Sequence, residues 1–185
     1  MTPETSLPQI EFPRSLTLPE STDELDEAKG LLRTHGMCVL TGVLTADETE
    51  ALRSKLEVQA DAERALGDLA PKGLVAATQV GPNLVNKGKE CLDLVERGET
   101  TALASSLLGR HFLVSSINGH YYLGPTAEPQ DLHRDQGQVP ATVPMSVVCN
   151  LLWALDDFVP DTGSTLVVPG SHRWAPEYQV TPPPN

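Results

Sequence analysis

Residues 130–136 read Gln-Asp-Leu-His-Arg-Asp-Gln, and this stretch carries most of the chemical information in the chain. In a β-strand, residues two apart project toward the same face, so a strand here would present the His133 imidazole and the Asp135 carboxylate side by side. Two histidines and one carboxylate on one face of an octahedron suit iron(II), because three positions stay open. By itself, His-x-Asp is a weak signal, since the same spacing occurs in ordinary hydrogen-bonded pairs.

Two stretches further along the chain narrow the interpretation. Residues 153–158 read Trp-Ala-Leu-Asp-Asp-Phe, and residues 162–174 read Thr-Gly-Ser-Thr-Leu-Val-Val-Pro-Gly-Ser-His-Arg-Trp. In this order after His-x-Asp, they resemble the phytanoyl-CoA dioxygenase family, in which an aspartate-rich turn, a Gly-containing loop and a strand ending in Pro-Gly-Ser-His follow the motif. The resemblance covers residues 110–175 well, and the beginning of the chain is also similar to the beginning of the family.

The resemblance implies a fold and an activity. The fold would be α+β with a mainly β core, an incomplete double-stranded β-helix (jelly roll, cupin-like) with flanking N-terminal helices. The activity would be that of an Fe(II)- and 2-oxoglutarate-dependent oxygenase that uses dioxygen to hydroxylate or desaturate a small organic molecule. His133 and Asp135 would bind the metal, and Gln130 and Thr165 would contact the oxo acid. A carboxylate at position 135, rather than Gly or Ala, favours these outcomes over halogenation.

The third metal ligand is not His172 if the resemblance holds. In the family, the histidine of Pro-Gly-Ser-His caps a turn, and the distal histidine and the arginine that binds 2-oxoglutarate lie several tens of residues further on. Both would lie beyond Asn185, so we expect a fragment of a longer protein or a truncated, inactive paralogue. Two alternatives stay open: a binding pseudoenzyme of the same fold, and a cupin-like hydrolase that holds zinc with His133, Asp135 and His172.

Local signals predict the elements around this motif. Four prolines predict an extended arm over residues 1–20, followed by a single partial domain over residues 21–185. We expect a helix over residues 22–35 with Thr22 as its cap, a short strand over 37–40, and a second helix opened by the capping box of Thr45 and Glu48. A third helix should cover 102–108. Glycines and prolines interrupt region 61–99, where one or two helical turns are expected over 90–96. Strands are predicted over 111–117, 145–155 and 165–168.

Composition excludes several classes of function. The net charge is −12, with 25 acidic and 13 basic residues, so we expect neither a nucleic-acid partner nor an anionic membrane surface. The chain has no long apolar run and no signal-peptide pattern, which predicts a cytoplasmic protein. Cys38, Cys91 and Cys149 are widely spaced, as is typical of reduced thiols. The sequence specifies neither the substrate nor the oligomeric state.

Overall fold

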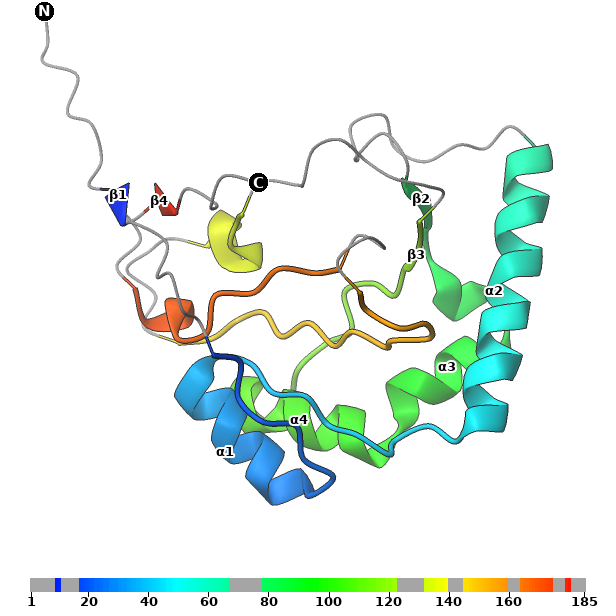
Figure 1. Cartoon of the computed structure of the whole chain (residues 1–185). Coiled ribbons are helices and arrows are strands. Elements are labelled where there is room, and N and C mark those ends of the chain that lie inside the picture. Colours follow the sequence, from blue (N-terminus) through cyan, green and yellow to red (C-terminus); the bar gives the residue numbers. More distant parts are fainter. Residues whose placement is uncertain are drawn as a thin grey trace, which may run out of the picture. The chain divides into compact units, whose positions relative to one another are not determined.

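The fold is described from a computed structural model, which covers residues 9–10, 17–66, 78–122, 132–139, 145–159, 164–174 and 179–180 (Figure 1). Its regular elements, in chain order, are β1 (Gln9–Ile10), α1 (Leu25–His35), α2 (Ala46–Ala65), β2 (Thr78–Gly81), the 3-10 helix η1 (Leu84–Asn86), α3 (Lys89–Glu96), α4 (Gly98–Leu108), β3 (Gly119–Tyr122), the 3-10 helices η2 (Asp135–Gln138) and η4 (Ser171–Arg173), and β4 (Gln179–Val180).

The chain divides into two compact units. The first unit consists of Met1–Leu40, Asp131–Val148 and Leu166–Asn185, and the second consists of Thr41–Gln130 and Cys149–Thr165. Each unit contains one two-stranded sheet: β1 pairs in parallel with β4 in the first, and β2 pairs antiparallel with β3 in the second. That residues 21–185 form a single domain remains a prediction.

In the first unit, α1 begins later than the sequence predicts. Its N-cap is Glu24, whose side chain makes no capping bond. The predicted cap, Thr22, instead accepts a hydrogen bond from the Glu24 N–H at 3.1 Å and donates its own backbone N–H to Val39 O at 3.0 Å. The helix ends as predicted at Gly36, whose φ of +73° is a left-handed conformation that favours glycine. The predicted strand over 37–40 is reduced to a single parallel bridge between Thr22 and Leu40.

In the second unit, α2 begins at the predicted capping box. The Thr45 hydroxyl accepts from the Glu48 N–H at 3.2 Å, and the Glu48 carboxylate accepts from the Thr45 N–H at 2.8 Å. These two bonds satisfy backbone donors that the first helical turn leaves unpaired. The Thr45 N–H, the Arg97 side chain and the Thr45 hydroxyl all donate to the Glu48 carboxylate and hold its pKa down at about 2.

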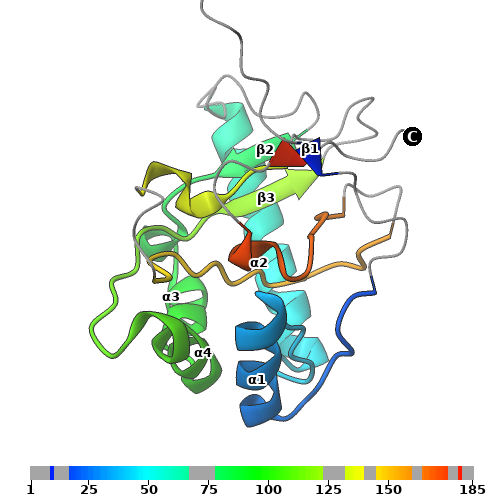
Figure 2. The same ribbon diagram turned by 90° about the vertical axis from the view of Figure 1, so that its left-hand side faces the viewer.

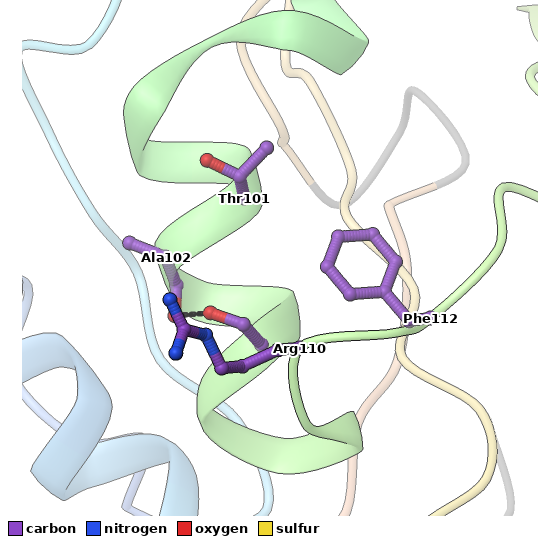
Figure 3. A pocket seen from close by; sticks show the side chains of 5 residues that line it. Thr101, Ala102, Arg110 and Phe112 are labelled. Carbon is purple, nitrogen blue, oxygen red and sulfur yellow. Dashed lines mark hydrogen bonds between the residues drawn. The ribbon is translucent and has the colours of Figure 1, made fainter.

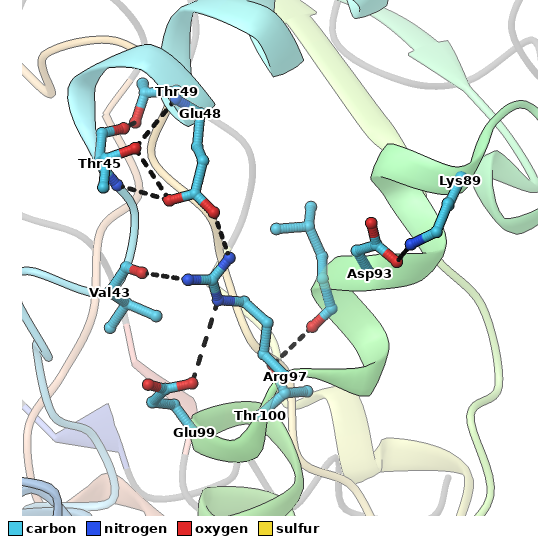
Figure 4. A network of polar contacts seen from close by, with 10 residues as sticks. Val43, Thr45, Glu48, Thr49, Lys89, Asp93, Arg97, Glu99 and Thr100 are labelled. Carbon is cyan, nitrogen blue, oxygen red and sulfur yellow. Dashed lines mark hydrogen bonds and ion pairs between the residues drawn. The ribbon is translucent and has the colours of Figure 1, made fainter.

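Arg97 ties the start of α2 to the junction between α3 and α4. Its guanidinium donates to the Glu48 carboxylate at 2.9 Å and to Val43 O at 2.6 Å (Figure 4). At the same junction, the Thr100 hydroxyl donates to Leu94 O at 2.7 Å, which satisfies a carbonyl at the end of α3. These bonds attach the junction of α3 and α4 to the start of α2 and link the first turn of α4 to the end of α3.

The sheet of the second unit packs against its helices. Figure 2 shows β2 and β3 side by side. In the register of this sheet, Gln79 lies opposite Tyr121 and Gly81 lies opposite Gly119. The Tyr121 ring lies over both glycines, and a Cβ on Gly119 would lie 2.8 Å from its hydroxyl oxygen. The buried apolar side chains of this unit lie on α2, β2, η1, α3 and α4: Leu52, Ala60, Val80, Leu84, Cys91, Leu94, Leu103 and Ala104.

The expected mainly β core is absent from the described part of the chain, where helices predominate. The described residues of the predicted strands 111–117, 145–155 and 165–168 form no strand, and β3 begins at Gly119 instead. A strand is defined by ladder hydrogen bonds to a neighbour, and an apolar run without a paired neighbour does not meet that condition. By contrast, α3 and α4 confirm the helical turns predicted at 90–96 and 102–108.

The three cysteines form no disulfide, as predicted. Burial raises the pKa of the Cys91 and Cys149 thiols. Among the described residues, none of the helices has the length and apolar character needed to cross a membrane.

Candidate metal centre

The structure brings the side chains of His133 and Asp135 together. Nε2 of His133 lies 3.2 Å from Oδ1 of Asp135, and the two side chains are 56% and 53% exposed. The contact is an ion pair only when the imidazole is protonated. The imidazole nitrogen of His133 and a carboxylate oxygen of Asp135, both of which can bind a metal, therefore lie close together where solvent can reach them.

The pair does not lie on a strand, which corrects the sequence prediction. His133 precedes η2, and Asp135 is the first residue of that helix. Between them, Arg134 is extended, with φ −108° and ψ 125°. One extended residue is enough to place the side chains of its two neighbours on the same side of the backbone. His133 and Asp135 therefore point to the same side although they do not belong to a strand.

Gln136, the next residue, connects this segment to residues 145–147 of the same unit. Its amide nitrogen donates to Met145 O at 3.1 Å, and its amide oxygen accepts from the Val147 N–H at 2.9 Å. Its own backbone carbonyl accepts from the Val139 N–H at 3.0 Å. Two of these three hydrogen bonds attach the segment that carries the pair to residues 145–147, and the third caps the end of η2. No signal in the sequence indicates this role, because no spacing rule links position 136 to position 146.

The sequence predicts that Gln130 and Thr165 contact an oxo acid. Gln130 lies outside the described residues. Thr165 is exposed and belongs to the second unit. Their roles remain predictions.

His172 packs against the end of α1. In the first unit, a Cβ built on Gly36 would lie 2.3 Å from Nδ1 of His172 and 2.7 Å from its Cγ. The neighbouring Gly170 N–H donates to His35 O at 2.6 Å, and the Arg173 guanidinium donates to Arg33 O at 3.1 Å. The Gly-Ser-His-Arg turn therefore caps the carbonyl end of α1.

Within the described part of the chain, no three His, Cys, Asp or Glu side chains are grouped so that they could hold a metal ion. A zinc site made of His133, Asp135 and His172 is therefore not formed.

A shallow depression of about 390 Å³ lies on the second unit, beside α4 (Figure 3). It is lined by Thr101, Ala102, Ser105, Arg110 and Phe112. The hydroxyls of Thr101 and Ser105 donate to carbonyls of their own helix, at 3.0 Å to Gly98 O and 3.2 Å to Ala102 O. With no imidazole and no carboxylate in its lining, this depression is not a metal site. No motif in the sequence indicates this depression.

One family model and several known proteins match this chain. The model of the family described as Phytanoyl-CoA dioxygenase (PhyH) matches residues 32–185. The chain is 29% identical to "Dioxygenase af480" and 28% identical to "Dioxygenase sphC", both of Aspergillus fumigatus, over 84% and 92% of its own length. It is 30% identical to "Dioxygenase trt7" of Aspergillus terreus over 80% of its length.

The chain spans about half the length of these relatives, namely 51%, 51% and 55%. No solved structure matches it.

Proposed function

The chain belongs to the phytanoyl-CoA dioxygenase family, and from this premise we propose that it is part of an iron(II)- and 2-oxoglutarate-dependent oxygenase that hydroxylates or desaturates a small organic molecule. In this proposal His133 and Asp135 are two of the protein ligands of the metal. The observation that carries it is the 3.2 Å separation of their donor atoms. The relatives named as dioxygenases support the same class of reaction.

The pair fits a ferrous ion in chemistry and in spacing. Histidine nitrogen and carboxylate oxygen are the ligands of the facial site that non-haem iron oxygenases use. Metal–ligand bonds of about 2.1 Å at right angles place neighbouring donor atoms about 3 Å apart. The observed separation of 3.2 Å is close to this value, which supports a shared ion.

Each residue has a definite task in this proposal. His133 must offer Nε2 without a proton, and Asp135 supplies a negative charge that partly neutralises the ion. When bound, ferrous iron supplies the activation of dioxygen that is coupled to the oxidative decarboxylation of 2-oxoglutarate. Gln130 and Thr165 would hold the oxo acid, and the exposed Thr165 is open to contact from solvent.

We also propose that residues 21–185 are part of one double-stranded β-helix domain. Family membership supports this, and so do the exposed apolar side chains of the predicted strands, since Met145 and Leu152 are each 65% exposed and Leu166 is 57% exposed. Exposed apolar runs of this kind are stabilised when further strands cover them. Hydrogen exchange on a chain of the relatives' length should show protected amides in 145–155 and 165–168. Fast exchange there would contradict the fold proposal.

A titration with Mn²⁺, followed by the electron paramagnetic resonance signal of the free ion, tests the metal proposal. We expect the wild-type chain to bind one ion, and His133→Ala and Asp135→Ala to weaken binding by more than about tenfold. His111→Ala is the matched control, since His111 is an exposed histidine outside the motif, and should bind like the wild type. Wild-type affinity in either ligand variant would refute the proposal.

His172→Ala separates the proposal from the zinc hydrolase. On the proposed function this variant keeps its metal affinity, because His172 lies against Gly36. A hydrolase site that uses His172 would lose the ion.

A further inference from the structure

We infer that Gln136 is the positioning residue of the metal pair: its side-chain amide docks the segment of His133 and Asp135 onto the backbone of residues 145–147. The inference rests on the proposed function. Gln136 follows Asp135 directly, and the two hydrogen bonds of its amide reach across 9 and 11 residues of sequence. All these residues belong to the first unit.

The two hydrogen bonds of the Gln136 amide have the same pattern as those that one residue makes in a parallel β-ladder. In a parallel ladder, one residue donates its N–H to the carbonyl before the residue opposite it and accepts from the N–H after that residue. The Gln136 amide does the same around position 146, with the Met145 carbonyl at 3.1 Å and the Val147 N–H at 2.9 Å. Gln136 therefore pairs with the backbone of residues 145–147 in the way that a residue of a neighbouring parallel strand would.

The consequence for the metal pair is preorganisation. His133 and Asp135 are more than half exposed, so packing alone restrains their side chains weakly. A bidentate amide anchored one residue after Asp135 limits how far the backbone of the pair can move. Groups that orient metal ligands in this way typically change metal affinity by about 10–100-fold when they are removed.

Gln136→Met tests the inference, because methionine is unbranched and of similar length but lacks both the donor and the acceptor. We expect the Mn²⁺ affinity to fall by about tenfold or more. We also expect amide exchange at Val147 to accelerate. Gln136→Asn, which is one methylene too short to make both bonds, should change both quantities in the same direction.

Gln59→Met is the matched control. Gln59 is also partly exposed, and its amide donates one side-chain hydrogen bond, to Glu63 at 2.8 Å in α2. Its loss should leave the metal affinity and Val147 exchange at wild-type values. A merely structural role of Gln136 would lower the unfolding midpoint without changing the affinity of the folded protein.

The outcomes separate the two proposals. If the wild type binds Mn²⁺ through His133 and Asp135, and Gln136→Met binds it equally well, the inference about Gln136 is wrong and the proposed function stands. If His133→Ala and Asp135→Ala bind like the wild type, the proposed function fails, and the positioning role fails with it. Unchanged Val147 exchange in Gln136→Met would overturn the docking contact itself.

Discussion

Replacing Gly36 with alanine tests how α1 ends and what His172 does. Gly36 has a φ of +73°, and the His172 ring occupies the place where a Cβ would stand. The closest ring atoms include Nδ1 at 2.3 Å and Cγ at 2.7 Å, and the Cβ of His172 is at 3.1 Å. Turning the ring about χ2 leaves Cγ in place, so the clash is relieved by a change of χ1 at His172 or by a shift of the turn that carries it.

The expected cost has two parts. A left-handed conformation costs a residue with a Cβ about 1–2 kcal/mol. Displacing the turn also breaks the bond from the Gly170 N–H to His35 O, which is worth about 0.5–1.5 kcal/mol. Gly36→Ala should therefore destabilise the protein by about 2–3 kcal/mol. For a chain of this size, each kcal/mol lowers the melting temperature by about 2–4 °C.

A double-mutant cycle with His172→Ala separates the two parts. Urea unfolding of the wild type, both single variants and the double variant gives the four free energies of unfolding. Without the ring, Gly36→Ala should cost only the backbone term, so the coupling between the two positions should be about 1 kcal/mol. Equal costs in both backgrounds would refute the packing of His172 on Gly36, and no cost in either would refute the left-handed end of α1.

Three further predictions concern the second unit. Thr45→Ala removes the cap of α2 and should cost about 1 kcal/mol in urea unfolding, whereas an unchanged midpoint would argue against the capping box. The pKa of Glu48 is lowered from 4.5 to about 2 in the folded state, so its stabilising contribution is complete above pH 4.5 and is lost as the pH falls toward 2. Glu48→Gln should therefore flatten the acid dependence of the melting temperature in that window, and a profile parallel to that of the wild type would be inconsistent with this role. Burial raises the pKa of Tyr121 to about 12, and its hydroxyl has no hydrogen-bond partner in the described structure, so Tyr121→Phe should be neutral or stabilising by up to about 1 kcal/mol. A clear loss of stability would show that the hydroxyl is bonded in solution.

The sequence predicted the helices where a local rule decides the outcome. The capping box of Thr45 and Glu48 and the glycine at position 36 are satisfied by atoms within a few residues, so distant parts of the chain do not alter them. Thr22 lies two residues before the actual N-cap, and its hydroxyl accepts from the Glu24 N–H rather than from a helical N–H. The Thr22 N–H is bonded to Val39 O, a contact beyond the helix that a local capping rule does not contain.

The strands could not be predicted as well, because a strand is completed by a partner elsewhere in the chain. Apolar runs at 145–155 and 165–168 have the composition of strands, and composition does not determine which segment pairs with them. The juxtaposition of His133 and Asp135 was predictable, since it needs only one extended residue between them. The docking of Gln136 onto residues 145–147 was not, because it depends on how the intervening chain returns.

The central claim is that His133 and Asp135 bind one ferrous ion together. The most direct test is to add 2-oxoglutarate to the ferrous protein under anaerobic conditions and to record the visible absorption spectrum. We expect a weak charge-transfer band of the iron–oxo acid chelate in a wild-type chain of the relatives' length, and its loss in Asp135→Ala. No band in the wild type, or a band of equal strength in the variant, would contradict it.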